Sequence, residues 1–341
     1  MAARSSLSIK YFLKLLASKF GRHNWPAVRP RLKILAYHRV LARDDPQVEL
    51  EQPAMWVTPE TFEKNIVWLK EKFEIIRLRD WVSTSTRTFK NKNYCCITFD
   101  DGWLDNYQCA LPILIKHNVP ITLFCVSEMI ESGLDFWPGR LASYVRQSVG
   151  TGRWPECLDD WPWLNAVVSD DEAIKQRPLG QANMDKLIDG CKIYSDSDIN
   201  QFLDIMFENE RKDYVQPRRL LNTIEVREMI ETGLVDIGSH TKYHTRLTTL
   251  RTDTQLTDEI LGSKLSLEAR FGVTVDLFCY PNGHWTRPAI EMVEQYYLGG
   301  CVLRSGWNYQ GQSLGDLKRF NMHEDIANEK VEFFSRMSGF I

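Results

Sequence analysis

The sequence predicts an α/β fold in which a mostly parallel sheet closes into a barrel. From residue 32 onward, short apolar segments alternate with helical patterns whose apolar residues recur every three or four positions. This alternation is typical of repeated strand–helix units. Eight segments have the length and composition of strands, a number that suits a barrel. They are 34–37, 74–78, 94–99, 121–126, 234–237, 276–280, 300–303 and 317–321.

Three helices between these strands have clear start signals. Thr58 and Pro59 precede a helix with apolar residues at 62, 66 and 69. Asn222, with Glu225 three residues later, forms the pattern of a capping box and predicts a second helix that ends at Gly233. A third helix is predicted to begin at Asp253 and to stop near Gly272.

Residues 137–220 interrupt this alternation and predict an insertion between two barrel strands. Tryptophans at 137, 154, 161 and 163 cluster among prolines and aspartates, and a helical pattern follows at 199–206. A connection of this length is usually a lid or a binding loop, although a purely structural subdomain is the alternative. We therefore expect a barrel formed by 32–136 and 221–330, and a C-terminal tail at 331–341.

Composition indicates a globular protein of a reducing compartment. The 341 residues are 43% hydrophobic and include eight cysteines, most of them in apolar runs. No apolar run reaches the roughly 18 to 20 residues that cross a bilayer, and the N-terminus lacks a secretory cleavage pattern. These features predict a cytoplasmic protein. After residue 33 the chain carries 34 basic and 45 acidic side chains. Because this part of the chain is net acidic, we expect no nucleic-acid partner.

The first 31 residues form a basic leader with the pattern of an amphipathic helix. Residues 1–33 carry eight basic side chains and no acidic one. Lys10 and Lys14 face away from an apolar side made by Ile9, Phe12, Leu13, Leu16 and Phe20. One interpretation is peripheral contact of residues 5–22 with anionic lipid at the inner face of a membrane. The other is a helix packed on the protein's own body.

Two adjacent carboxylates end the strand predicted at 94–99. Asp100 and Asp101 come directly after apolar residues and are followed by Gly102. The active site of a β/α barrel lies at the carboxyl ends of its strands. A simple Asp-Gly turn is the alternative reading of this segment.

Two histidines follow another predicted strand, 234–237, in the same way. His240 and His244 are four residues apart, a spacing that places both imidazoles on one side of a helical turn. With a carboxylate as third ligand, they would hold one divalent ion and leave positions open for water and substrate.

These two segments resemble the first two motifs of the polysaccharide deacetylase family, also called the NodB-homology or family 4 carbohydrate esterases. The first motif is Thr98-Phe99-Asp100-Asp101-Gly102, and the second is His240-Thr241-Lys242-Tyr243-His244. The resemblance implies a distorted (β/α)7-8 barrel and metal-dependent removal of an N-acetyl or O-acetyl group from a carbohydrate. It implies that Asp100 is the catalytic base and that Asp101, His240 and His244 bind the metal, for which zinc is expected.

A third segment, 278–283, resembles the family motif whose backbone N–H helps to bind the oxyanion. Asn282 stands in place of the usual aromatic residue, and the arginine that steadies the base is missing from this segment. Arg319 and Arg304 are the candidates to replace that arginine.

The general acid has two candidates. Residues 34–40, Ile-Leu-Ala-Tyr-His-Arg-Val, resemble a permuted subgroup whose acid comes from the first strand, which implies that His38 is the acid. His323 occupies the late position that unpermuted relatives use.

The expected substrate is a lipid-linked or nucleotide-linked N-acetyl sugar of glycan biosynthesis. Trp103, Tyr280 and Trp137 are the expected substrate contacts, because flat aromatic faces stack on sugar rings. Three alternatives stay open: a deformylase or other hydrolase of non-sugar amides, a carbohydrate-binding protein that has lost turnover, and a phosphodiesterase with two metals.

Overall fold

The computed structural model describes residues 2–83, 88–150, 162–169, 181–210 and 218–339. The chain divides into two compact units. The first comprises 1–45, 53–132 and 220–341, and the second comprises 46–52 and 133–219. Trp154 and Trp161 of the predicted cluster lie outside the described residues. Within the described residues, no helix combines the length and hydropathy that a membrane crossing requires.

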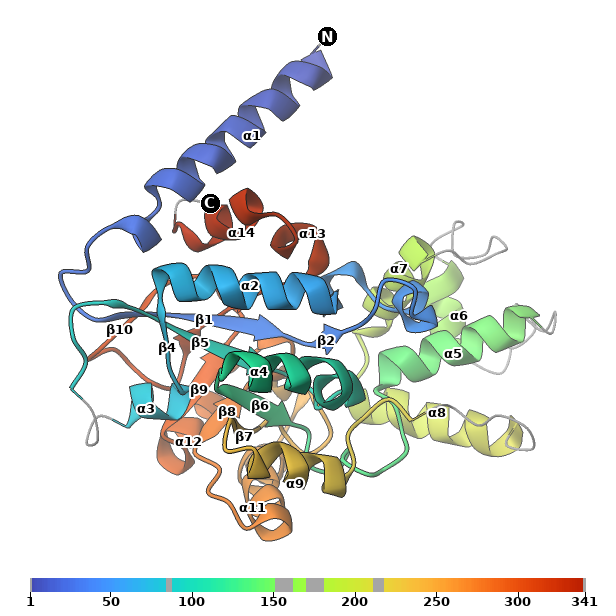
Figure 1. The fold of residues 1–341 in the computed structure, drawn as a ribbon. Helices are drawn as coiled ribbons and strands as arrows, with labels where there is room; N and C mark the ends of the chain where they lie inside the picture. Colours follow the sequence, from blue (N-terminus) through green and yellow to red (C-terminus); the bar gives the residue numbers. More distant parts are fainter. Residues whose placement is uncertain (1, 84–87, 151–161, 170–180, 211–217, 340–341) are drawn as a thin grey trace. The chain divides into compact units, whose positions relative to one another are not determined.

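The first unit is built on a parallel sheet, as predicted (Figure 1). Its successive strands are β1 (Arg31–Tyr37), β5 (Asn93–Phe99), β6 (Ile121–Cys125), β7 (Val235–Ser239), β8 (Leu277–Cys279), β9 (Gly299–Val302) and β11 (Leu317–Lys318). Two shorter strands extend this sheet. β4 (Glu74–Ile75) pairs with β5, and β10 (Asn308–Tyr309) pairs antiparallel with β1. A separate small sheet contains β2 (Arg39–Val40) and β3 (Trp56–Val57).

The segment 317–321 brings the two edges of the sheet together. The sequence predicts one strand here, but the structure has two, interrupted at Arg319. β11 pairs with β9 at one edge, whereas β12 (Phe320–Asn321) pairs with β1 at the other. One short segment therefore contacts both edges, and the sheet is a nearly closed barrel.

Side chains alternate between the inside of this barrel and the helices around it, as the two-residue period of a strand requires. One buried cluster draws on strands from both ends of the sheet, which is possible only because the sheet curls. It includes Ile34, Cys96, Phe124, Cys279, Cys301 and Leu317. A larger cluster lies on the opposite face, beneath the helices, and includes Leu35, Ile97, Leu123, Ile237 and Phe278.

Two helices around the sheet begin with the predicted capping residues. The Thr58 side chain accepts a hydrogen bond from the Thr61 N–H, and Asn222 and Glu225 form the capping box. A second box, Thr252 with Gln255, starts the third predicted helix. The α-helices here are α2 (Pro59–Lys72), α3 (Leu78–Val82), α4 (Leu111–His117), α9 (Thr223–Glu231), α10 (Asp253–Thr257), α11 (Ser263–Phe271) and α12 (Arg287–Tyr296).

Short helical turns join these elements. Five-residue π-turns precede α4 at Asn106–Ala110 and link α10 to α11 at Asp258–Gly262. Turns of 3-10 helix are at Arg22–Asn24, Pro46–Leu50, Pro53–Met55, Leu247–Thr249 and Pro281–Gly283.

The expected C-terminal tail is instead part of the core. Residues beyond 323 form α13 (Glu324–Ala327) and α14 (Lys330–Met337), and Phe333 and Met337 are fully buried. The leader forms α1 (Ala2–Phe20), and its C-terminal end lies against α14 (Figure 1). The next turn holds it there, because His23 stacks on Phe334 with ring centroids 5.0 Å apart.

The second unit is a small helical body with its own core. It contains α5 (Trp137–Gly150), α6 (Pro162–Ser169), α7 (Gln181–Cys191) and α8 (Asp196–Glu210). Trp137 is a core residue of this unit, and its Nε1–H donates to Asp196 at 2.9 Å. The expectation that Trp137 stacks on a sugar is therefore wrong for this structure, because the ring is buried. Residues 46–52 belong to this unit and are joined to it by an ion pair between Glu51 and Arg219.

Helix α2 fixes the strands that lead to the candidate site, and Phe62 is its central contact. The Phe62 ring lies edge-on to Tyr37 at the end of β1 and to Phe99 at the end of β5, with centroids 5.1 and 5.3 Å apart. We predict that Phe62→Ala lowers the free energy of unfolding by about 3 to 5 kcal/mol in a denaturant titration. The matched control on the same helix is Val67→Ala, at a half-exposed position, with a change below about 0.5 kcal/mol. Equal effects of the two substitutions would contradict this account.

Candidate metal site and active site

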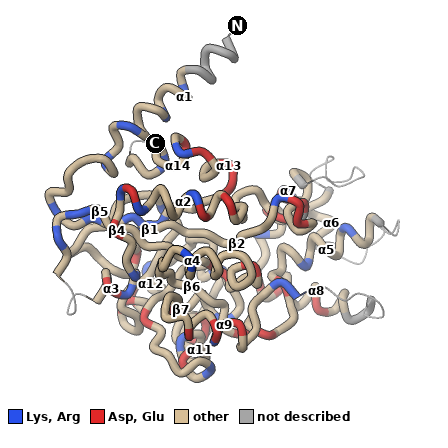
Figure 2. Tube along the Cα trace, in the orientation of Figure 1, with Lys and Arg blue, Asp and Glu red and all other residues tan. Residues whose placement is uncertain are grey.

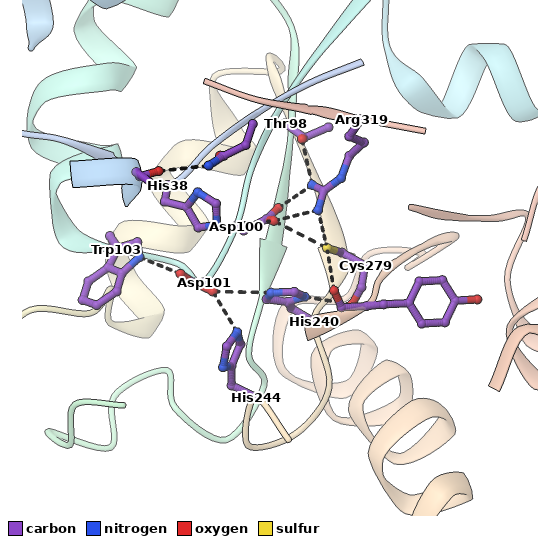
Figure 3. Close-up of polar contacts among 12 residues, drawn as sticks. His38, Thr98, Asp100, Asp101, Trp103, His240, His244, Cys279 and Arg319 are labelled. Atoms are coloured by element: carbon purple, nitrogen blue, oxygen red, sulfur yellow. Dashed lines mark hydrogen bonds and ion pairs between the residues drawn. The ribbon is translucent and has the colours of Figure 1, made fainter. Parts of the chain in front are cut away.

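The two carboxylates at the end of β5 point in different directions. Both Asp100 and Asp101 are buried. Asp101 has a φ of 75° and Gly102 a φ of 81°, so the chain turns sharply through the left-handed region, which is costly for a residue other than glycine. As a result, Asp100 faces Arg319 while Asp101 faces two histidines (Figure 3).

Asp101, His240 and His244 converge in the arrangement of a metal site. Asp101 Oδ1 lies 3.4 Å from His240 Nε2 and 3.4 Å from His244 Nε2. Ligand atoms held about 2.0 to 2.2 Å from one tetrahedral ion lie about 3.3 to 3.6 Å from each other. Within the described residues, Asp101 Oδ1 is buried and accepts no hydrogen bond. The spacing and the unsatisfied oxygen both fit a divalent cation.

Two further contacts orient these ligands. The Trp103 Nε1–H donates to the other carboxylate oxygen of Asp101 at 2.9 Å, and His240 Nδ1 lies 2.8 Å from the carbonyl oxygen of Cys279. The second contact makes Nδ1 the protonated nitrogen and leaves the lone pair of Nε2 directed at Asp101. The sequence predicted the three candidate ligands but did not indicate these two supporting contacts.

The electrostatics of the cluster favour added positive charge. Burial alone would raise the pKa of Asp101, but its close contact with His240 and the nearby His244 and His38 hold this pKa well below its usual range. Burial lowers the pKa of His240, and the carboxylates of Asp101 and Asp100 more than compensate, so that pKa is raised. The cluster therefore attracts either a proton or a metal ion.

The histidines come together by a route different from the predicted one. Residues 240–244 form a loop, not a helical turn, and Thr241 and His244 have φ values of 69° and 61°. The buried Glu259 carboxylate holds this loop by accepting hydrogen bonds from the backbone N–H groups of Lys242 and Tyr243 and from the Thr245 hydroxyl. Glu259 was not singled out in the sequence, because it is distant along the chain and carries no motif.

Asp100 is held by Arg319 through both carboxylate oxygens. The two nitrogen–oxygen distances are 2.7 and 2.8 Å, and the same guanidinium contacts the Thr98 hydroxyl and Cys279 Sγ (Figure 3). Burial would raise the pKa of Asp100, but the charge and hydrogen bonds of Arg319 outweigh burial and lower it. The other candidate arginine, Arg304, is half-exposed and pairs with Asp316 instead.

His38 lies beside Asp100, and His323 does not. His38 Nε2 is 3.8 Å from Asp100 Oδ2, and the His38 side chain retains a small exposed area. His323 directly precedes α13, and its Nδ1 lies 3.9 Å from Asp325. Among the described residues, His38 is thus the candidate acid that contacts the candidate base.

Of three other predicted site residues, two are buried and the third lies in the turn where the sequence predicts it. Trp103 is buried under the Arg39 guanidinium, and Tyr280 is fully buried with its hydroxyl bonded to the Gly315 carbonyl. Neither ring is available to stack on a sugar, so these two expectations are wrong. Asn282 is exposed in the turn after β8, with a φ of 55°.

Trp103 provides a direct test of the metal site. We predict that Trp103→Phe weakens zinc binding about 10- to 100-fold in a competitive chelator titration, because the carboxylate loses the N–H that orients it. Asp101→Asn and His244→Ala serve as reference variants with larger losses. Trp285→Phe, at a partly exposed position, should leave the affinity unchanged. An unchanged affinity in Trp103→Phe would show that this hydrogen bond does not support the site.

Comparison with known proteins agrees with this geometry. Residues 88–157 and 207–299 match the family model described as polysaccharide deacetylase. The Bacillus subtilis (strain 168) protein YxkH is 29% identical over 102 residues, which cover 29% of this chain and about a third (33%) of that protein.

Solved structures share the fold at low identity. BC0361, a polysaccharide deacetylase from Bacillus cereus, has a TM-score of 0.56 at 17% identity, with 89% of this chain and 69% of that chain covered. The Streptococcus pyogenes deacetylase PplD has a TM-score of 0.57 at 16% identity, with 91% and 99% covered. IcaB from Ammonifex degensii has a TM-score of 0.56 at 15% identity, with 91% and 100% covered. The two matched segments contain both motifs, so the chain is similar to the polysaccharide deacetylase family in sequence over these segments and in fold.

Proposed function

We propose that this protein is a metal-dependent hydrolase that removes an N-acetyl group, or an O-acetyl group, from a carbohydrate. The observation that carries the proposal is the convergence of Asp101, His240 and His244 next to a carboxylate held by an arginine. A divalent ion bound there would acidify a nearby water and polarise the acyl oxygen. We propose zinc, because two imidazoles and one carboxylate form a donor set typical of catalytic zinc sites.

The chain's own residues would divide the proton transfers between them. Asp100, ionised and fixed by Arg319, would accept the proton of the attacking water as the C–O bond forms. The backbone at Asn282 would donate an N–H to the developing oxyanion. His38 in its protonated form would give its proton to the leaving nitrogen as the C–N bond breaks, so that an amine leaves and not an amide anion. We place this acid directly after the first strand, the arrangement of the permuted subgroup.

Asp100→Asn separates proton transfer from metal binding. We predict that this variant keeps stoichiometric zinc and loses about 10²- to 10⁴-fold in turnover, because the amide cannot accept the proton. Asp101→Asn should lose both zinc and turnover. Metal content is measured by mass spectrometry, and turnover by acetate release from N-acetylated sugar oligomers. Wild-type turnover in Asp100→Asn would refute the assignment of the base.

Arg319 acts through Asp100, and a conservative change tests this positioning role. Arg319→Lys keeps the positive charge but loses the two parallel hydrogen bonds. We predict that kcat falls about 10- to 100-fold while KM stays nearly constant, because a shift of the base slows proton transfer without removing a substrate contact. Arg304→Lys is the matched control with unchanged kcat. A change in KM alone would contradict the positioning role.

Substrate and location belong to the same proposal. We propose a lipid-linked or nucleotide-linked N-acetyl sugar as substrate and a cytoplasmic location, which the seven free cysteines among the described residues support. A parallel panel of N-acetyl and N-formyl substrates discriminates the deacetylase from a deformylase. Release of formate but not acetate would favour the deformylase, and zinc binding without any acyl release would favour a carbohydrate-binding protein.

A further inference from the structure

The outer side of α1 is an exposed apolar surface on a helix that carries no acidic residue. Its five large apolar side chains are between 36% and 61% exposed, and we call them the α1 stripe: Ile9, Phe12, Leu13, Leu16 and Phe20. On a helical wheel these positions cover an arc of about 100°. Beyond the helix, Trp25 and Val28 are also exposed.

Helix α1 contacts the protein body through another side, which leaves the stripe uncovered. Ala17 is buried, and Lys14 Nζ pairs with Glu332 of α14 at 2.6 Å. Both residues lie outside the arc of the stripe. After the helix, the Arg22 N–H donates to the Ser338 carbonyl, so the base of α1 is tied to the end of α14. Packing on the body, one of the two interpretations of the leader, therefore does not account for its apolar residues.

The charge of the N-terminal segment indicates which kind of partner would cover the α1 stripe. Residues 1–33 carry eight basic side chains and no acidic one, and Figure 2 shows basic positions without acidic ones along the described part of α1. Lys10 and Lys19 are exposed and flank the stripe on its two sides. Docking two copies of this helix would bring like charges together, whereas an anionic lipid surface offers both negative headgroups and an apolar interior.

We propose that the α1 stripe docks the protein on an anionic membrane surface. The helix would lie in the plane of the interface with the stripe facing the acyl chains, while Lys10 and Lys19 extend to the headgroups. The inference goes beyond the proposed function, and it concerns a surface that shares no residue with the candidate site.

Vesicle sedimentation with the full chain tests this surface. We expect binding to vesicles of phosphatidylcholine with phosphatidylglycerol and at least about tenfold weaker binding to phosphatidylcholine alone. The double variant Phe12→Ser, Leu16→Ser should reduce binding to the anionic vesicles at least about tenfold, because two inserted side chains are lost. The matched control is Ile115→Ser, Ile224→Ser, which replaces two exposed apolar residues on α4 and α9 and should bind like the wild type.

Two further measurements keep the outcome clear. Equal binding of the wild type and the Phe12→Ser, Leu16→Ser variant would overturn the proposal. A lipid-free dimer of the wild type in sedimentation equilibrium that becomes a monomer in the same variant would also overturn the proposal, because a second copy would then cover the stripe. Acetate release from a soluble substrate should be unchanged in this variant, so failure of docking is distinguishable from failure of the catalytic proposal.

Discussion

One buried carboxylate oxygen, Asp101 Oδ1, organises the candidate site. It lies 3.4 Å from two imidazole nitrogens and accepts no hydrogen bond within the described residues. Such an oxygen is costly to bury unless a cation compensates it. Three residues around it, Asp101, Thr241 and His244, have positive φ values, which indicates that backbone strain is concentrated where the ligands converge. The surrounding fold must hold these conformations in place.

Barrel closure supplies the second half of the site. The segment 317–321 pairs with β9 before Arg319 and with β1 after it. The Arg319 guanidinium points into the barrel and forms an ion pair with Asp100. Strand pairing at the closure thus positions the arginine, while the sharp turn at Asp101 separates the two carboxylates. Because of this turn, Asp100 contacts Arg319 and Asp101 contacts the two histidines. The two neighbouring carboxylates therefore lie in different environments and suit different chemical roles.

Local signals in the sequence predicted much of this arrangement. Strand segments, capping residues and the carboxylates and imidazoles at strand ends follow from periodicity and from the shared carboxyl edge of parallel strands. Features that depend on distant contacts were missed. Glu259 supports the histidine loop from the turn between α10 and α11, and Trp103 was expected at the substrate but lies buried against Asp101. Residues 240–244 were expected to be helical because spacing alone does not reveal positive φ values.

The central claim is that Asp101, His240 and His244 together bind one divalent ion. Anomalous diffraction at the zinc edge, from crystals of the full chain grown with zinc, tests it most directly. The account predicts one dominant peak about 2.0 to 2.2 Å from Asp101 Oδ1, His240 Nε2 and His244 Nε2. A dominant peak elsewhere, or three side chains that turn away from a common point in the presence of zinc, would contradict it.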